Sequence, residues 1–192
     1  MDPIGSINFK KDSTLSILIE AQSRKHDLIY MEPSSLFLRE DGAYALTQEI
    51  KVRDDSENWF ELSDTSEMRL SDLDMIVMRQ DPPFDVNYIY NTYVLETAER
   101  EEVIVINKPQ SLRDCNEKVF ATEFPQCCTP FLVTSNQSLL KEFIKEHLDT
   151  VVKPLDGMGG SSIFRVRSLD PNIAVILENI TKNGDTKVMI QK

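Results

Sequence analysis

Residues 151–166 read VVKPLDGMGGSSIFRV and hold three of the six glycines of the chain: Gly157, Gly159 and Gly160. An apolar run that carries Lys153 leads into the glycines, and a run that alternates apolar and polar residues leads out. Glycine adopts positive φ angles and lets backbone N–H groups approach a ligand closely. A lysine beside free N–H groups suits the phosphates of a nucleoside triphosphate. The stretch therefore predicts two strands joined by a loop that covers nucleotide phosphates.

Two better-known phosphate loops do not fit this stretch. The Walker-type loop ends in Gly-Lys-Ser/Thr and opens a helix, and the dinucleotide fingerprint also needs a helix after its glycines. Here Ile163, Phe164 and Val166 follow the loop in the pattern of a strand. From these residues alone, an ordinary glycine-rich turn is as good an interpretation as a phosphate-binding flap.

The composition describes a globular, acidic protein. The 192 residues carry 21 basic and 32 acidic side chains, which gives a net charge of −11, and 41% of the residues are hydrophobic. Sequence-independent nucleic-acid binding needs a basic surface, so we expect neither a nucleic acid nor an anionic membrane as partner. No segment approaches the ~20 apolar residues of a membrane-spanning helix. Three cysteines without a metal-binding spacing fit reduced thiols in the cytoplasm.

The pattern of apolar residues predicts an α/β protein with a parallel sheet. The apolar run 103–106 is typical of a strand buried on both faces. The acidic segment 40–70 indicates an irregular or partly paired insertion. The predicted helices are 13–25, 87–101, 111–124, 137–147 and 172–182, and the predicted strands are 28–31, 73–79, 103–106, 131–134, 151–155, 162–167 and 187–191.

We place a domain boundary near residue 113. Both ends of the chain look unfinished. The first helix lacks a preceding buried strand apart from residues 1–4, and the chain stops inside or just after its last strand. Our hypothesis is that the sequence is a fragment, or that an internal methionine was taken as its start.

Four stretches together resemble the bacterial-type glutathione synthetases, which are ATP-grasp ligases. They are MDPI and IN-KKDS within residues 1–13, MR-DPPFD in 78–85, NKPQSLRDCNEK in 107–118 and KPLDGMGG-SIFRV in 153–166. The resemblance implies an α/β fold with two domains. A Rossmann-like pre-ATP-grasp domain over residues 1–113, with most of its first strand missing, precedes an incomplete ATP-grasp domain over residues 114–192. It also implies a cytoplasmic enzyme that forms a homotetramer when complete.

The resemblance further implies a reaction, the ligation of glycine to γ-glutamylcysteine with ATP and Mg²⁺. ATP phosphorylates the cysteinyl carboxylate, and the glycine amine attacks the resulting acyl phosphate. Because two anions meet in the first step, catalysis depends mainly on charge neutralisation and positioning. Lys118 and Lys153 match the two ATP-binding lysines of the family, and Gln191 falls where its strand reaches the adenine edge. The loop residues that would enclose the phosphates are Asp156, Gly157, Met158, Gly159, Gly160 and Ser161.

Three residues of the first domain are candidates for binding γ-glutamylcysteine. Arg79 follows an apolar strand, where open α/β sheets bind ligands, and its guanidinium suits a carboxylate. A salt bridge from Arg79 to Asp81 or Asp85 is an equally good interpretation. Asn8 and Ser13 flank the loop before the first helix, whose N-terminus favours anions, although a plain capping loop also fits.

In this family the Mg²⁺ ligands lie near the C-terminus, so the resemblance places them beyond residue 192 and leaves no metal site in this chain. We therefore expect that the 192-residue polypeptide by itself does not make glutathione. One alternative is another ATP-grasp ligase, of the D-alanine or ribosomal-modification type. The other is a non-catalytic nucleotide-binding or assembly module that joins a full-length partner.

Overall fold

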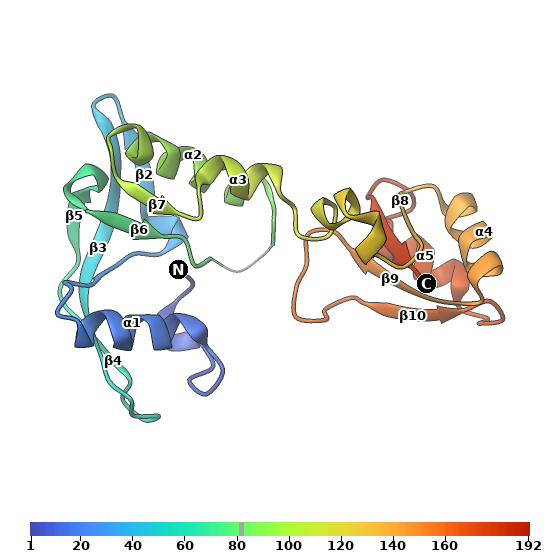
Figure 1. Cartoon of the computed structure of the whole chain (residues 1–192), viewed down its shortest axis with the longest axis horizontal. Helices are drawn as coiled ribbons and strands as arrows, with labels where there is room; N and C mark the ends of the chain where they lie inside the picture. The colour runs from blue at the N-terminus through green and yellow to red at the C-terminus, as the bar shows by residue number, and fades with distance from the viewer. Residues whose placement is uncertain (81–82) are drawn as a thin grey trace. The chain divides into compact units, whose positions relative to one another are not determined.

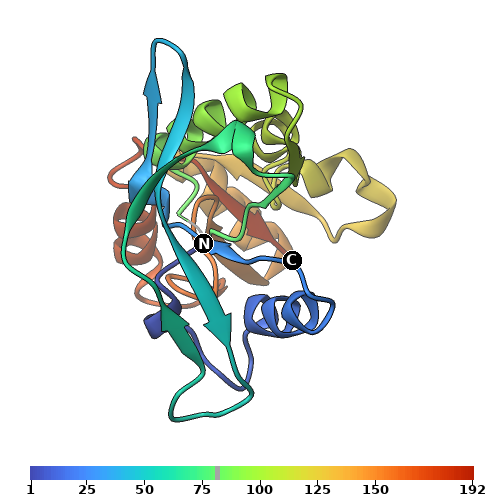
Figure 2. The same ribbon diagram turned by 90° about the vertical axis from the view of Figure 1, so that its left-hand side faces the viewer.

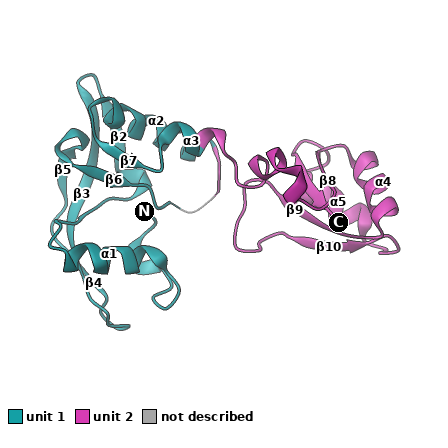
Figure 3. Cartoon of the chain, in the orientation of Figure 1, with its two compact units in different colours: residues 1–81, 86–112 teal, residues 82–85, 113–192 magenta. Residues whose placement is uncertain are grey.

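The structure is a computed structural model that describes residues 1–80 and 83–192 (Figure 1). The described residues form two compact units (Figure 3). Unit 1 comprises residues 1–80 and 86–112, and unit 2 comprises residues 83–85 and 113–192. Unit 1 contains a five-stranded sheet, a two-stranded sheet and two hydrophobic clusters, and unit 2 contains a four-stranded sheet with its own hydrophobic core. No helix in the described ranges has the length and apolar character needed to cross a membrane.

Unit 1 is built around β3 (Gly42–Val52), an eleven-residue strand that pairs antiparallel with four shorter ones (Figure 2). Of the two alternatives for residues 40–70, the irregular one is therefore wrong, and the segment is paired over most of its length. Buried and more exposed side chains alternate along much of β3, with Ala43 and Ala45 in the core, so the strand has one face toward the interior. The partners of β3 are β1 (Ile29–Tyr30), β2 (Leu36–Arg39), β4 (Phe60–Leu62) and β5 (Ser66–Arg69).

Two helices and a pair of parallel strands complete unit 1. Asp12 caps the first helix, because its side chain accepts hydrogen bonds from the N–H groups of Thr14 and Leu15. The elements are α1 (Ser13–Ser23), β6 (Met75–Val77), α2 (Val86–Arg100) and β7 (Ile104–Ile106), with the short 3-10 turns η1 (Ile4–Ser6), η2 (Pro33–Ser35) and η3 (Leu70–Asp72).

Only one face of the β6–β7 pair is buried. Ile76 and Val105 pack with Leu95 of α2 in the core of unit 1. On the other face, Ile104 is 60% and Ile106 is 44% exposed. The prediction of a strand buried on both faces is therefore wrong for β7, because within the described residues no element covers its second face.

Residues 111–124 do not form the single predicted helix. α3 (Pro109–Asp114) ends at Asp114, and the 3-10 turns η4 (Phe120–Glu123) and η5 (Pro125–Cys127) follow later. Between them, Asn116 turns the chain, since its Oδ1 accepts hydrogen bonds of 3.1 Å from the N–H groups of Lys118 and Val119. Asparagine side chains compete in this way with backbone acceptors, which interrupts a helix.

Unit 2 is a four-stranded antiparallel sheet in the order β10-β9-β11-β8. Val152, Val166 and Ile190 of the sheet pack against Leu140 and Leu177 of two helices. The predicted strands and helices of residues 131–191 are confirmed to within a few residues. They are β8 (Phe131–Thr134), α4 (Gln137–His147), β9 (Asp149–Pro154), β10 (Phe164–Arg167), α5 (Ile173–Ile180) and β11 (Val188–Gln191).

Candidate functional site

The glycine-rich loop joins β9 to β10, as the sequence predicts. The two strands pair antiparallel with Val152 opposite Phe164, so residues 155–163 form the loop of a hairpin. Gly159 and Gly160 have φ angles of 65° and 80°. In the part of the chain that the structure describes, no heavy atom beyond the chain neighbours lies within 4 Å of the place where a Cβ would stand at either glycine. The positive φ angles therefore favour glycine there, and the space around the loop is open to a ligand.

Lys118 and Asn116 hold the start of this loop. The Lys118 ammonium donates to the carbonyl of Gly157 and, over 2.8 Å, to Glu117 Oε1. The Asn116 amide donates over 3.0 Å to the carbonyl of Leu155. The Lys118 side chain is only 12% exposed. Because an ammonium group has three donors, Lys118 can fix the loop and still offer one donor to an anion.

Lys153 and Gln191 lie on the sheet face opposite the helices. Lys153 stands across from Met189, and Gln191 stands across from Val151. The intervening Val152 points into the helix-covered core, and side chains alternate across a strand. Lys153 and Gln191 therefore share one face as diagonal neighbours. Within residues 1–80 and 83–192, no hydrogen bond or ion pair engages the Lys153 ammonium.

The remaining predicted loop residues form the turn through their backbones. The Asp156 carbonyl accepts a hydrogen bond of 3.2 Å from the N–H of Phe84, and the Met158 carbonyl accepts one of 3.2 Å from the N–H of Ser161. A Cβ on Gly157 would come within 3.3 Å of a Pro154 side-chain atom, so crowding favours glycine at this position. The side chains of Asp156, Met158 and Ser161 are exposed and accessible to a ligand.

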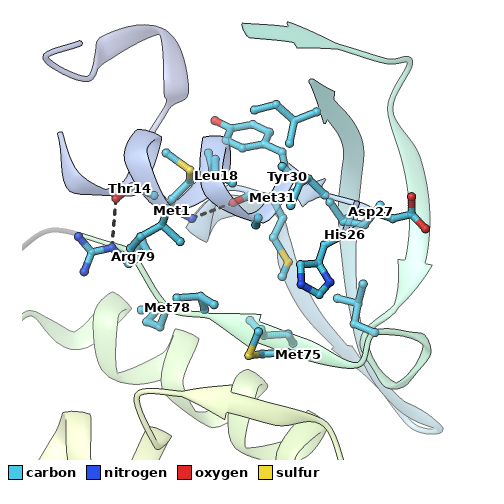
Figure 4. Close-up of a pocket in the computed structure, with 18 of the residues that line it drawn as sticks. Met1, Thr14, Leu18, His26, Asp27, Tyr30, Met31, Met75, Met78 and Arg79 are labelled. Carbon is cyan, nitrogen blue, oxygen red and sulfur yellow. Dashed lines mark hydrogen bonds between the residues drawn. The ribbon is translucent and has the colours of Figure 1, made fainter. Parts of the chain in front are cut away.

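In unit 1, Arg79 and Ser13 lie together. The Arg79 guanidinium donates to Ser13 Oγ over 2.9 Å and to Thr14 Oγ1 over 3.1 Å (Figure 4 shows the second bond). Both hydroxyls belong to the first turn of α1. A guanidinium has five N–H donors, so Arg79 keeps donors for a carboxylate near the helix N-terminus. Asp81, one of the salt-bridge partners considered for Arg79, lies outside the described residues.

Asn8 forms a turn and makes no hydrogen bond to Arg79 among the described contacts. Its Oδ1 accepts a hydrogen bond of 3.2 Å from the N–H of Lys10. Its carbonyl accepts hydrogen bonds of 2.9 Å from the N–H groups of Lys11 and Asp12. These contacts fit the plain capping loop that the sequence analysis gave as the alternative for Asn8. The turn places Asp12 where it caps the N-terminus of α1.

Sequence reasoning missed Asn116 and Thr14. Asn116 lies in the stretch 107–118, but a bond from Asn116 to Leu155 spans 39 residues and leaves no periodic signal. Thr14 had a local signal, because a second hydroxyl directly follows Ser13 at a helix N-terminus.

The described residues do not form a metal site on their own. In residues 1–80 and 83–192, no group of three or more His, Cys, Asp or Glu side chains is placed to hold a metal ion. These residues therefore do not fit a complete Mg²⁺ site.

The fold is that of the ATP-grasp ligases. The chain is similar to D-alanyl-alanine synthetase A from Vibrio cholerae, with a TM-score of 0.53 over 92% of this chain and 53% of that one, at 14% identity. It is also similar to the ATP-grasp ligase PsnB complexed with minimal precursor, with a TM-score of 0.51 over 95% of this chain and 61% of that one, at 13% identity. At such identities the likeness establishes the fold alone, and it confirms the predicted α/β class. The predicted parallel sheet is found only in the β6–β7 pair, because all other strand pairs of the described residues are antiparallel.

Two family models define the group more closely. The model of the prokaryotic glutathione synthetase N-terminal domain matches residues 1–113. The model of the prokaryotic glutathione synthetase ATP-grasp domain matches residues 117–192. The chain belongs to the prokaryotic glutathione synthetase family, as its motifs predicted.

Curated relatives agree with this family. The chain is 52% identical to the glutathione synthetase of Pseudomonas putida over 191 residues and 52% identical to that of Pseudomonas aeruginosa over 192 residues. All of this chain is aligned in both comparisons. The chain spans only 60% and 61% of the lengths of these two relatives.

Proposed function

We propose that this chain is part of a glutathione synthetase and supplies its nucleotide-covering loop and part of its γ-glutamylcysteine site. The whole enzyme would join glycine to γ-glutamylcysteine through an acyl phosphate, releasing ADP and phosphate. Family membership supports the reaction. The observation that carries the role of unit 2 is the bond from the Lys118 ammonium to the Gly157 carbonyl, at the root of the glycine-rich loop.

The proposed ATP site combines charge with open backbone. Lys153 and Lys118 are cations that would neutralise phosphate oxygens during phosphoryl transfer to a carboxylate. The exposed turn at Gly159 and Gly160 leaves room for phosphates against its N–H groups. Gln191 shares the sheet face of Lys153, and its amide has both a donor and an acceptor for the adenine edge.

Arg79 is the proposed anchor for γ-glutamylcysteine. Its guanidinium is exposed, is fixed by the hydroxyls of Ser13 and Thr14, and adjoins the N-terminus of α1. Guanidinium groups bind carboxylates through paired, charge-assisted hydrogen bonds, and helix N-termini favour anions. Arg79 and Ser13 would therefore orient a carboxylate of the dipeptide, while Asn8 shapes the adjoining loop.

The setting proposed for the whole enzyme is the cytoplasm, with Mg²⁺ as cofactor and a homotetramer as assembly. The three cysteines are free, which fits a reducing compartment. The net charge of −11 disfavours nucleic acids and anionic membranes as partners.

Equilibrium dialysis of the 192-residue chain with labelled ATP tests the nucleotide site. We expect Lys153→Met to abolish measurable ATP binding and Lys141→Met, on exposed α4, to leave it unchanged. Equal ATP binding by wild type and Lys153→Met would exclude this site. A turnover assay with ATP, Mg²⁺, glycine and γ-glutamylcysteine should give no glutathione, and glutathione formation by this chain alone would contradict the expectation of inactivity.

One other candidate is a non-catalytic nucleotide-binding or assembly module, because the open turn at Gly159 and Gly160 would allow nucleotide binding without catalysis. Such a module would bind ATP and also associate with a full-length glutathione synthetase. The tagged chain would then co-purify with a full-length synthetase, and dilution of the tagged chain would separate the two proteins. This result would favour the module.

A further inference from the structure

Two of the three cysteines are adjacent in the chain. Cys127 is the last residue of η5, and Cys128 follows it directly. Both are free thiols; Cys127 is exposed and Cys128 is half-buried. The third cysteine, Cys115, is also exposed and comes directly after α3. Neither the proposed nucleotide site nor the proposed substrate site uses the two adjacent thiols, which we call the Cys127–Cys128 pair.

The local fold holds the two thiols of the pair differently. The Cys128 Sγ donates a hydrogen bond of 3.2 Å to the carbonyl of Ala121, so this thiol is held against η4. Among the described residues, no hydrogen bond engages the Cys127 Sγ. Because η5 ends at Cys127 and the chain bends at Cys128, this segment is not a strand that would send neighbouring side chains to opposite faces. One thiol is therefore held in place, and the other is free to turn toward it.

The pair is poorly placed to close into a disulfide. The peptide bond between Cys127 and Cys128 is trans, so their Cα atoms are about 3.8 Å apart. Ordinary disulfides join Cα atoms about 4.4–6.8 Å apart, and disulfides outside this geometry store strain and are easily reduced. An atom that bonds to both sulfurs lets them stay further apart and relieves this strain. The pair therefore favours a bridging ligand over oxidation to a disulfide.

The number of available ligands decides which atom can bridge the pair. Thiolates select soft, polarisable centres. Structural Zn²⁺ takes four protein ligands, and residues 1–80 and 83–192 contain no group of three or more His, Cys, Asp or Glu side chains placed to hold a metal ion. Trivalent arsenic with one organic substituent needs only two protein sulfurs, because the substituent occupies its third position. The pair thus matches an organic trivalent arsenical better than it matches zinc.

Two exposed aromatic residues belong to the same turns as the pair. Phe120 is 44% and Phe124 is 48% exposed, and their ring centroids lie 5.8 Å apart in an edge-to-face arrangement. The Cys127 N–H donates over 2.9 Å to the Phe124 carbonyl, and Ala121, whose carbonyl holds Cys128, directly follows Phe120. Aromatic rings pack well on one another in offset or edge-to-face geometry. An aryl substituent on the arsenic atom therefore suits this segment.

We propose that the Cys127–Cys128 pair is a dithiol site for trivalent aryl arsenicals. An arylarsine oxide would form two As–S bonds, one to each Sγ. Its As–O double bond breaks, and the oxygen leaves as water with the two thiol protons. Arsenic stays trivalent, so the step needs no oxidant or reductant. Because the second As–S bond forms within one molecule, its effective concentration is high and the pair binds far more tightly than a single thiol.

The test uses phenylarsine oxide and the 192-residue chain, purified under reducing conditions and then freed of reductant. Thiols are counted by exchange with a chromogenic disulfide, and we expect three per chain before treatment. Phenylarsine oxide should remove the two thiols of the pair and leave Cys115, and intact mass spectrometry should show one phenylarsenic group in place of two hydrogens. Dimercaptopropanol should restore the thiols, whereas mercaptoethanol at the same thiol concentration should not, since only a dithiol chelates arsenic in turn.

Three single variants locate the site. Cys127→Ser and Cys128→Ser each leave one thiol of the pair and should weaken phenylarsine oxide binding about a hundredfold or more. Serine at position 128 keeps a donor for the Ala121 carbonyl, so the local fold is retained. Cys115→Ser removes an exposed thiol outside the pair and is the matched control, with the affinity of the wild type. The thiol count on the wild type does not depend on how any variant folds.

Several results would overturn the proposal. Fewer than three thiols in the untreated chain, with a mass lower by two hydrogens, would show that the pair closes into a disulfide. Loss of a single thiol per arsenical, or equal reversal by mercaptoethanol, would show attachment through one thiol only. Loss of binding in Cys115→Ser would place the arsenical on Cys115 and not on the pair.

Discussion

The side-chain amide of Asn116 donates a hydrogen bond of 3.0 Å to the carbonyl of Leu155, the first residue after β9. The same side chain accepts hydrogen bonds from the N–H groups of Lys118 and Val119. Asn116 thus fixes the position of Lys118 and the start of the glycine-rich loop at once. The loop is held at its root and exposed at Gly159 and Gly160.

We expect Asn116→Ala to weaken ATP binding several-fold and to lower the free energy of unfolding by about 1–2 kcal/mol, because the Leu155 carbonyl and two N–H groups lose their partner. Asn116→Asp is the matched comparison. It keeps the acceptor for Lys118 and Val119 but sets a carboxylate oxygen against the Leu155 carbonyl, so it should weaken ATP binding at least as much as Asn116→Ala. Equilibrium dialysis and urea denaturation measure the two quantities. If the ATP affinity of Asn116→Ala equals that of the wild type, Asn116 does not contribute to nucleotide binding.

Gly159 tests the backbone requirement of the loop. Its φ angle of 65° is left-handed, and a Cβ there would meet no neighbouring atom. Gly159→Ala should therefore lower the free energy of unfolding by about 1 kcal/mol through backbone strain alone. Gly159→Asn should cost less, because asparagine tolerates the left-handed region. If the two variants unfold at the same urea concentration as the wild type, the loop does not need this conformation.

Arg79 tests the proposed substrate site. Arg79→Lys keeps the positive charge but replaces the planar guanidinium with a compact ammonium group. The ammonium group cannot bind a carboxylate in a paired fashion and also bond to both α1 hydroxyls. We expect the affinity for γ-glutamylcysteine, measured by titration calorimetry, to fall about tenfold or more. The control is Arg100→Lys, on an exposed side chain of α2 paired with Glu96. An unchanged affinity in Arg79→Lys would show that Arg79 has only a structural role, in which it connects the segment after β6 to α1.

Local sequence signals predicted residues 131–191 of unit 2 well. Asn136 accepts hydrogen bonds from the N–H groups of Ser138 and Leu139, and the predicted bounds of α4 equal the observed ones. Its buried residues Leu140 and Ile144 are four apart, which is the spacing of one helix face. Capping and periodicity are short-range properties, so a single sequence contains them.

Contacts that leave no periodic pattern explain the errors. Asn116 interrupts the predicted helix 111–124 through local hydrogen bonds from the N–H groups of Lys118 and Val119. Its contact with Leu155, which periodicity does not detect, holds this turn against the glycine-rich loop. The acidic residues Asp54, Asp55 and Glu57 lie in the β3–β4 connection, so the acidity that suggested an irregular segment belongs to a loop and not to the alternating strand β3. The Arg79 contacts with the first turn of α1 span 65 and 66 residues. The sequence identified Arg79 and Ser13 as separate candidates for the substrate site. Their direct contact is seen only in the structure.

Tyr30 should make the stability of unit 1 depend on alkaline pH. Its hydroxyl donates to Glu32 Oε1 over 2.7 Å and accepts a hydrogen bond of 3.1 Å from the N–H of Ile4. Burial, and then the bond to Glu32, raise the pKa of Tyr30 from 10.0 to about 12. Because the folded pKa lies above the unfolded one, the stabilisation is complete below pH 10 and is lost as the pH rises through 12.

We therefore expect the free energy of unfolding of the wild type to fall between pH 10 and pH 12 more steeply than that of Tyr30→Phe, which lacks the titrating hydroxyl. At neutral pH Tyr30→Phe should be less stable by about 1 kcal/mol, because the Ile4 N–H loses its acceptor. Tyr90→Phe, on an exposed side chain of α2, serves as the control and should follow the wild type. Urea denaturation at several pH values gives the comparison, and phenolate absorbance reports the titration directly. Parallel stability curves for the wild type and Tyr30→Phe across this pH range would show that Tyr30 titrates alike in the folded and unfolded chains.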